Sequence, residues 1–454
     1  MTTITFKKNK DTIEHIKSNP DLFFRFVQNE KVSNIVYLLN KLGRLNGDFN
    51  KGLLTPLLSH DNKKIRFLAL KNLAKLQDIE LVKYYKDILK KDESADVRRE
   101  AVSAIGRLRN KENINFLIEL LKDKDPEVVL QAIRGLLVFK KEKIVLNNLI
   151  KLKNHKNEIV REIIEIEFKT RKKNVKKQKH TEFSQLLKNK VVLGDAQKIL
   201  KYVPDESIHL TFTSPPYYNA RDYSTYQSYE EYLTFLEKIF KEIYRTTKEG
   251  RFFILNTSPI IIPRVSRNHS SKRYPIPYDL HSILMKMGWE FIDDIIWAKP
   301  EASVKNRNAG FLQHRKPLAY KANSRSEMIM VYRKKTDKLI DWNMKQYPFH
   351  IVNESKVHGK YETSNIWNID PVFDKTHSAV FPEELCNRVI KFYSFIGDLV
   401  FDPFAGSGTL GKSALKLKRN FFLTEKDKKY FERIKEILGE KSDIIYSKFN
   451  NKKI

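Results

Sequence analysis

The chain has 454 residues, with 85 Lys and Arg against 55 Asp and Glu, which gives a formal net charge of +30. A surface this basic predicts a polyanionic partner, and nucleic acid is the first candidate. The single cysteine excludes a disulfide framework or a cysteine-based metal cluster within the chain, and it indicates a reducing compartment. No stretch approaches the roughly 20 apolar residues of a membrane span, and the start has no apolar leader, so we expect an intracellular protein.

The first third of the chain carries a repeat. Small alanines recur at Ala69, Ala101 and Ala132, spaced by 32 and 31 residues, each within an apolar pattern of helical period. A fourth copy continues at 31 residues, with Ile163 in the alanine place and Val160 where the first two copies have arginine. Each of the first three copies predicts two helices joined by a polar turn, and such pairs stack into a solenoid. The copies resemble short HEAT repeats, so we expect an all-α HEAT-like solenoid over residues 1–168; an irregular helical domain is the alternative.

A basic segment separates this region from a different pattern. Residues 169–180 hold seven Lys and Arg and almost no apolar residue, which predicts a basic linker over residues 169–185. Beyond it, short apolar runs alternate with helical segments, which predicts an α/β sheet domain over residues 186–454. The expected strands are Val191–Leu193, Ile208–Thr213, Phe252–Leu255, Phe291–Trp297, Met328–Val331, Leu399–Phe401 and Phe421–Leu423. The expected helices include Tyr229–Tyr244, Pro382–Phe395 and Leu410–Lys418.

One predicted strand runs through a glycine-containing turn into a helix. Asp402 follows the strand, Gly406 and Gly408 lie in the turn, and Thr409 precedes the helix. Glycine lets the backbone approach a ligand closely, and a helix N-terminus presents unpaired N–H groups. Glu425 ends the next strand, where an acid would bind the ribose hydroxyls of an adenosine-containing cofactor. The turn lacks the third glycine of a dinucleotide fingerprint and the Gly-Lys-Ser/Thr of a phosphate loop, which disfavours a pyrophosphate cofactor.

A second motif, Thr213-Ser214-Pro215-Pro216-Tyr217, stands at the end of another predicted strand. The two prolines have φ near −65° and no N–H, which leaves carbonyls free to face a ligand. The Ser214 hydroxyl adds an acceptor, and Tyr217 adds a ring face. These groups are suited to holding the planar exocyclic amine of a flipped base. A proline-stiffened turn is the purely structural alternative.

Together the two motifs resemble one family, the DNA amino-methyltransferases that use S-adenosylmethionine. Their order, with Ser-Pro-Pro-Tyr before Phe-x-Gly-x-Gly, is similar to the circularly permuted β class. The resemblance covers about residues 190–440 and implies a Rossmann-like methyltransferase domain that methylates cytosine N4 in double-stranded DNA. Ser214 in the first catalytic place is similar to the N4 branch; adenine N6, an RNA substrate and a non-catalytic nucleic-acid scaffold are the alternatives. Further matching segments are Gly194-Asp195, Gly250–Phe253, Ile296–Pro300, Asn365–Trp367 and His377–Leu385.

The resemblance implies a role for each motif residue. The catalytic residues are Ser214, Pro215, Pro216 and Tyr217; Ser214 and the Pro215 carbonyl accept the target N–H groups, and Tyr217 stacks on the base. Asp402 lies near the amino group of the cofactor, Glu425 reaches its ribose, Asp195 contacts its adenine end, and Thr213 borders the pocket. The methionine side of the cofactor is lined by Phe404, Ala405, Gly406, Ser407, Gly408 and Thr409.

DNA contacts are expected near the catalytic motif and in a target-recognition region at about residues 300–375. The candidates are Arg221, Lys299, Lys305, Arg307, Arg315 and Lys316. The histidines show no paired ligand spacing, so no metal is expected. No membrane partner is expected either. The resemblance further implies a cytoplasmic, nucleoid-associated prokaryotic protein, with a cognate restriction endonuclease as a candidate partner.

Two roles remain open for the helical domain. Its basic residues could hold DNA that flanks the target, which would add salt-sensitive affinity. Alternatively, it docks a protein such as a nuclease or a specificity subunit. The residues that favour DNA are Lys63, Lys64, Arg66, Arg98, Arg99 and Arg107.

Overall fold

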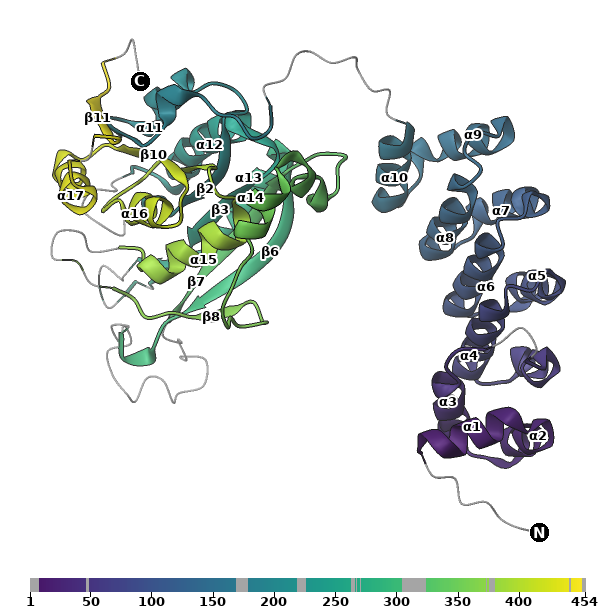
Figure 1. The fold of residues 1–454 in the computed structure, drawn as a ribbon. Helices are drawn as coiled ribbons and strands as arrows, with labels where there is room; N and C mark the ends of the chain where they lie inside the picture. The colour runs from purple at the N-terminus through teal and green to yellow at the C-terminus, as the bar shows by residue number, and fades with distance from the viewer. Residues whose placement is uncertain are drawn as a thin grey trace. The chain divides into compact units, whose positions relative to one another are not determined.

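The computed structural model divides the chain into two compact units, Met1–Lys173 and Asn174–Ile454. It describes residues 8–45, 49–168, 179–218, 226–262, 266, 268–269, 271–303, 324–372, 374, 380–440 and 442–450. Figure 1 shows a helical first unit and a second unit built on a central sheet. In the part of the chain that the structure describes, no helix is both long and apolar enough to cross a lipid bilayer.

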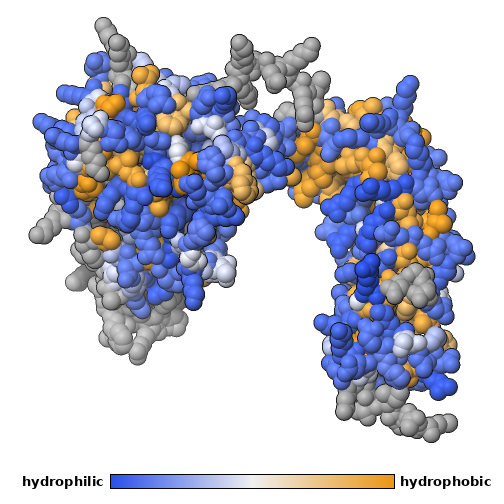
Figure 2. All heavy atoms as spheres, in the orientation of Figure 1, coloured by the Kyte–Doolittle hydropathy of each residue, from blue (hydrophilic) through white to orange (hydrophobic). Residues whose placement is uncertain are grey.

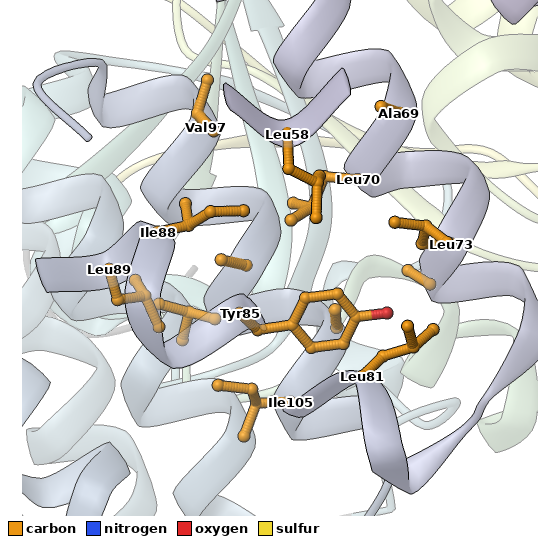
Figure 3. Close-up of a cluster of buried hydrophobic side chains, with 14 of the residues drawn as sticks. Leu58, Ala69, Leu70, Leu73, Leu81, Tyr85, Ile88, Leu89, Val97 and Ile105 are labelled. Atoms are coloured by element: carbon orange, nitrogen blue, oxygen red, sulfur yellow. The ribbon is translucent and has the colours of Figure 1, made fainter. Parts of the chain in front are cut away.

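Helices of the first unit pack in consecutive pairs. They are α1 Lys10–Ser18, α2 Pro20–Asn29, α3 Val32–Lys41, α4 Lys63–Leu73, α5 Val82–Lys91, α6 Ala95–Arg107, α7 Ile114–Glu119, α8 Pro126–Leu137, α9 Lys143–Ile150 and α10 Glu158–Phe168. Helices α4, α6, α8 and α10 contact one another in sequence order, and α5, α7 and α9 contact the helix that follows each. The first three repeat alanines are fully buried between these layers. Figure 3 shows Tyr85 of α5 among Leu73, Leu81 and Ile105.

Paired arginines join successive repeats. Arg66 Nε and Nη2 donate to the Asp92 carboxylate at 2.7 and 2.9 Å, and Arg98 donates to Asp123 at 3.1 and 3.0 Å in the same way. The Nη1 group of each arginine also donates to two backbone carbonyls in the turn before its own helix. Such two-pronged contacts fix direction as well as distance, so these arginines set the stacking of the repeats.

The predicted register of the fourth copy is wrong by one residue. Arg161, not Val160, takes the arginine place, because its Nη1 donates to the carbonyls of His155 and Lys156 at 2.6 and 2.8 Å. The fully buried Ile164 takes the alanine place, and Ile163 is only half-buried. The physical reason is a spacing of 32 residues from Asp123 to His155, one longer than the 31 from Asp92 to Asp123.

The arginines proposed to wrap DNA are mostly engaged within the helical unit. Besides the pairs of Arg66 and Arg98, Arg99 makes a salt bridge with Glu127, and Arg107 makes one with Glu100. The DNA-wrapping interpretation therefore rests on Lys63 and Lys64. Figure 2 shows apolar side chains gathered over the last helices of this unit, where Val138, Ile144, Ile159 and Ile166 are exposed.

The second unit contains a nine-stranded mixed sheet in the order β11-β1-β10-β9-β2-β3-β7-β6-β8. Its strands are β1 Lys190–Leu193, β2 Ile208–Thr213, β3 Thr247–Thr257, β6 Trp289–Ala298, β7 Ser326–Lys334, β8 Ile366–Asn368, β9 Leu399–Asp402, β10 Asn420–Glu425 and β11 Ile445–Lys448. Neighbours from β11 to β3 are parallel, and β7 is antiparallel to both β3 and β6. A separate hairpin pairs β4 Ile260–Ile262 with β5 Lys272–Tyr274.

Helices cover both faces of this sheet. They are α11 Ala196–Ile199, α12 Tyr229–Thr246, α13 Ile276–Met287, α14 Phe349–Glu354, α15 Glu383–Tyr393, α16 Thr409–Lys416 and α17 Lys428–Leu438. Alternate residues of a strand point to opposite faces. Phe253 and Leu255 of β3 accordingly join the core under α12 and α13, and Ile254 joins the core under α15, α16 and α17. The predicted α/β sheet domain is confirmed, and all seven expected strands are present.

A buried ion pair lies at the end of the sheet where β9 begins. Asp398 makes a salt bridge with Arg251 of β3, and it accepts hydrogen bonds from the Tyr347 hydroxyl at 2.5 Å and the Phe395 N–H at 2.8 Å. Burial acts to raise the pKa of Asp398, but Arg251 and the other donors outweigh it, and the pKa lies below its usual value. Both charges of the pair are satisfied within the protein.

Candidate functional site

The predicted glycine turn connects β9 to α16 at the opposite end of the strand. Gly406 and Gly408 have φ of +53° and +78°, the left-handed region that favours glycine. A Cβ on Gly408 would also lie 3.0 Å from the Ile434 side chain of α17. Gly408 is therefore required by the packing of the turn against α17 and by its backbone conformation. The Ser407 and Thr409 hydroxyls lie 3.0 Å apart at the start of α16.

Two buried carboxyl groups flank this turn, one at the end of each of two neighbouring strands. Asp402 Oδ1 accepts from Thr213 Oγ1 at 2.6 Å and from the Phe404 N–H at 3.0 Å. Glu425 accepts from the N–H groups of Gly406 and Asp427, both at 2.8 Å. Burial raises the pKa of each carboxyl to about 7, against these hydrogen bonds, which act to lower it. Neither makes a salt bridge within the described residues, so both are poised to accept from a bound donor or cation.

Asp195 extends this acidic edge to a third strand. It follows β1, which lies beside β10, and its Oδ1 accepts from the Gln197 N–H at 2.9 Å as the N-cap of α11. The neighbouring Gly194 N–H donates to the Glu425 carbonyl at 2.8 Å. The carboxyl ends of β1, β10 and β9 thus bring Asp195, Glu425 and Asp402 to the same end of the sheet. These three residues form the acidic edge.

The residues at this edge fit the cofactor that the resemblance implies. S-adenosylmethionine carries an ammonium, a sulfonium and ribose hydroxyls, that is, positive charge and hydrogen-bond donors. Among the described residues no cation pairs with the buried acceptors Asp402 and Glu425, and burying a carboxylate without a cation is costly. A bound ligand with these donors would supply what the two carboxyls lack. The chemistry of the site therefore matches that of the cofactor.

The second motif lies directly beside this edge. Thr213 ends β2, the strand next to β9, and the Thr213–Asp402 hydrogen bond joins the two motifs, which are far apart in sequence. Ser214, Pro216 and Tyr217 are partly exposed, and Pro215 is buried. The structure therefore brings the predicted catalytic and cofactor residues together at the carboxyl ends of parallel strands, where α/β sheets bind ligands.

Two polar residues of this site were missed by the sequence analysis. Glu327 of β7 accepts from the Tyr217 hydroxyl at 3.1 Å and from Asn256 Nδ2 at 2.5 Å. Asn256 of β3 also lies 3.4 Å from Ser214 Oγ, to which it donates. Burial raises the pKa of Tyr217 well above its usual value, and Glu327 adds to that effect. The only signal in the sequence was a carboxylate at the edge of an apolar strand pattern.

Most of the predicted DNA contacts cannot be placed. Arg221, Lys305, Arg307, Arg315 and Lys316 lie outside the described residues, and their roles stay predictions. Lys299 is described, and its ammonium makes a salt bridge with Glu327 and lies 4.2 Å from the centre of the Trp297 ring. Within the predicted target-recognition region, residues 326–334 form β7 in the middle of the sheet. No group of three potential metal ligands occurs among the described residues.

Comparison with known proteins gives a consistent result. A family model for DNA methylases matches residues 208–436, half of the 454-residue chain, and a model for HEAT repeats matches residues 82–167. The Type II methyltransferase M.MwoI of Methanothermobacter wolfeii is 30% identical over 273 residues, which cover 56% of this chain and 36% of that protein. The chain thus spans about a third of the length of this relative.

Two further similarities have better coverage of the matched protein. The Type II methyltransferase M.ScaI of Streptomyces caespitosus is 31% identical over 237 residues, which cover 50% of this chain and 73% of that protein. The crystal structure of a putative DNA modification methylase from Thermus thermophilus is 24% identical, with a TM-score of 0.46, and the match covers 57% of this chain and 100% of that one. On the family match and the relative from Streptomyces, the chain belongs to the DNA methylase family, and its predicted cofactor, S-adenosylmethionine, is thereby confirmed.

Proposed function

We propose that this protein transfers a methyl group from S-adenosylmethionine to N4 of a cytosine in double-stranded DNA. The observation that carries the proposal is the hydrogen bond between Thr213 and Asp402 at 2.6 Å. It joins a Ser-Pro-Pro-Tyr loop, which can hold an amine, to a buried acidic edge, which can hold a cofactor. A binding module would not require both parts side by side.

The catalytic loop would act on the amine by position and hydrogen bonding. The lone pair of an exocyclic amine is delocalised into the base, which makes it a poor nucleophile. Ser214 Oγ and the Pro215 carbonyl accept the two N–H groups and draw them out of the plane, and Tyr217 supports the base by stacking. When bound, the cofactor would supply an electrophilic methyl group on its sulfonium sulfur. The N–C bond would form as the S–C bond breaks, a neutral thioether would leave, and the methylated amine would lose one N–H proton to solvent. Because no covalent intermediate with the protein is needed, the rate depends mainly on orientation.

The cofactor would be held by the acidic edge and the glycine turn. Asp402 accepts from its ammonium, Glu425 from its ribose hydroxyls, and Asp195 contacts its adenine end. The turn supplies backbone and side-chain contacts along the methionine part. The residues of that turn are Phe404, Ala405, Gly406, Ser407, Gly408 and Thr409.

Two finer assignments belong to the same proposal. The strand with the catalytic loop precedes the strand with the glycine turn, although the two are neighbours, which supports a circularly permuted β-class arrangement. A serine in the first catalytic place supports cytosine over adenine. Both amines fit the same acceptors, so adenine N6 is the runner-up.

The biological setting follows from these assignments. The relatives M.MwoI and M.ScaI are Type II methyltransferases by name. A methyltransferase of this kind would protect host DNA against a cognate restriction endonuclease in the cytoplasm, beside the nucleoid. Residues 1–168 are assigned as a HEAT-like domain, and the methyl-transfer domain begins at residue 186. Of the linker predicted over residues 169–185, residues 169–178 lie outside the described residues.

The direct test is to map modified bases in cellular DNA. Wild-type protein, Ser214→Ala and the control Ser442→Ala, which alters an exposed serine, are expressed in a host without DNA modification of its own. We expect N4-methylcytosine within one short sequence for the wild type and the control, and none for Ser214→Ala. N6-methyladenine would overturn the target base, and unmodified DNA with the wild type would overturn the activity on DNA.

A further inference from the structure

A cluster of three polar residues lies beside the catalytic loop. Its members are Asn256, Lys299 and Glu327. Glu327 accepts hydrogen bonds from the Tyr217 hydroxyl at 3.1 Å and from Asn256 Nδ2 at 2.5 Å, and it makes a salt bridge with Lys299. Asn256 in turn donates to Ser214 Oγ at 3.4 Å. Both loop residues that the proposed function uses are thus connected to one carboxylate.

Adjacent strands bring this cluster together. Asn256 lies near the end of β3, Glu327 near the start of the antiparallel β7, and Lys299 directly after β6. The backbone N–H of Lys299 donates to the Arg325 carbonyl at 2.9 Å, which continues the pairing of β6 and β7 beyond the strand. The cluster therefore rests on regular sheet structure, which holds side chains more firmly than a loop does.

The charge balance of the cluster explains why a carboxylate can stay there. The side chains of Glu327 and Lys299 are only 18% and 20% exposed. Each charge is balanced by the other, and the Lys299 ammonium also lies against the Trp297 ring. A partly buried pair of this kind keeps its geometry better than an exposed one.

The carboxylate also determines how the Asn256 amide is turned. Asn256 is almost fully buried, and its Nδ2 donates to both Glu327 and Ser214, whereas its buried Oδ1 has no hydrogen-bond partner within the described residues. The opposite rotamer would place Oδ1 against the Glu327 carboxylate and would be repelled. Glu327 thereby ensures that the Asn256 N–H, a donor, faces Ser214. This N–H occupies one lone pair of Ser214 Oγ and leaves the second lone pair to accept from the target amine.

We propose that Glu327 is a positioning residue for methyl transfer, which sets Tyr217 through its hydroxyl and Ser214 through the Asn256 amide. This inference rests on the proposed function, because it assumes that Ser214 and Tyr217 hold the target base. Lys299 is the counter-ion of Glu327. Loss of the carboxylate weakens the hydrogen bonds of Glu327 with the Tyr217 hydroxyl and with the Asn256 amide, so methyl transfer slows while cofactor binding at the acidic edge is retained.

The test compares single-turnover rates of methyl transfer. The full-length protein, in excess, transfers a tritiated methyl group from S-adenosylmethionine to unmodified chromosomal DNA. We expect Glu327→Gln to be about 10- to 100-fold slower than the wild type, since small misplacements of reacting groups have effects of that size. Its affinities for S-adenosylmethionine and DNA should be unchanged. The matched control is Glu290→Gln, which removes a carboxylate at the other end of β6 that contacts Arg333, and it should transfer at the wild-type rate.

A double-mutant cycle separates positioning from a general effect on stability. If Glu327 acts partly through the Tyr217 hydroxyl, Glu327→Gln should slow Tyr217→Phe by less than it slows the wild type. Glu327→Asp, which keeps the charge but withdraws the oxygens, should also be slow and covers the case in which Glu327→Gln does not fold. A wild-type rate in Glu327→Asp, or fully additive effects in the cycle, would overturn the inference. Absence of methyl transfer by the wild type would instead overturn the proposed function itself.

Discussion

Strand β9 has a buried aspartate at each end, and the two lie in opposite electrostatic surroundings. Asp398, directly before the strand, is paired with Arg251 and has a lowered pKa. Asp402, the last residue of the strand, accepts from Thr213 and from a backbone N–H, and burial raises its pKa to about 7. Their exposed fractions, 1% and 3%, are nearly equal. The difference therefore comes from the internal cation, not from the depth of burial.

This difference distinguishes the end of the sheet at Asp398, which has a structural role, from the end at Asp402, which is suited to binding. A buried carboxylate with its own cation is satisfied by folding alone and contributes to the fold. A buried carboxylate without one is costly in the free protein and becomes favourable when a ligand brings positive charge or donors. Asp402 and Glu425 are of the second kind, and both lie at the carboxyl ends of parallel strands.

The largest expected effect is on stability, at the Asp398 end of β9. Asp398→Asn leaves the fully buried Arg251 without its counter-charge, so we expect the free energy of unfolding to fall by about 3–5 kcal/mol. Urea unfolding followed by circular dichroism measures this. The exposed Asp337→Asn serves as the control and should change the free energy of unfolding little. A similarly small effect of Asp398→Asn would show that the pair does not stabilise the fold.

The second largest expected effect is on cofactor binding, at the Asp402 end of β9. Asp402→Asn keeps an acceptor for Thr213 and Phe404 but removes the negative charge. We expect the dissociation constant for S-adenosylmethionine to rise about 10- to 100-fold, the range for hydrogen bonds to a charged group. The free energy of unfolding without cofactor should stay equal or increase, because a neutral amide is easier to bury. Isothermal titration calorimetry and urea unfolding give the two values; a loss of stability without a loss of affinity would make Asp402 structural.

A smaller effect is expected from pH. Because the pKa of Asp402 and of Glu425 in the free protein is about 7, both are largely protonated at pH 6. A cofactor that requires one of them ionised should bind roughly tenfold more weakly at pH 6 than at pH 8. The measurement is the dissociation constant at both values, and Asp402→Asn should reduce the difference.

Stability should change in the opposite direction. The folded state keeps protons on Asp402 and Glu425 up to about pH 7, whereas the unfolded state releases them near pH 4. These two groups therefore contribute stability that is present at low pH and is lost as pH rises toward 7. The free energy of unfolding of the wild type should accordingly fall relative to that of Asp402→Asn between pH 5 and pH 8. A constant difference would mean that Asp402 is already ionised.

The parts of the site that are contiguous in the chain could be predicted from the sequence. Thr213 to Tyr217 and Asp402 to Thr409 each combine a strand end with a distinctive turn, so local pattern was sufficient. Asn256, Glu327 and Lys299 come together only because β3, β7 and β6 are neighbours. The antiparallel direction of β7 has no signature in an apolar strand, and the contact could not be foreseen.

The error in the fourth repeat has a similar origin. Ile163 and Ile164 are both apolar, so hydrophobic spacing could not decide which one is buried. The better signal was polar: His60, Asn62 and Arg66 recur at the same spacing as His155, Asn157 and Arg161. In both turns the histidine Nδ1 accepts from the asparagine N–H, and the arginine caps the turn. Hydrogen-bonded turn residues therefore identify the register better than the apolar core does.

The most direct test of the proposed activity uses purified protein. Unmodified DNA is incubated with S-adenosylmethionine that carries a trideuterated methyl group, and the nucleosides are analysed by mass spectrometry. We expect labelled N4-methylcytosine with the wild type, none with Ser214→Ala, and a much reduced amount with Asp402→Asn when the cofactor is limiting. Labelled N6-methyladenine would contradict the assigned base, and DNA without label after incubation with the folded wild type would contradict the assigned activity.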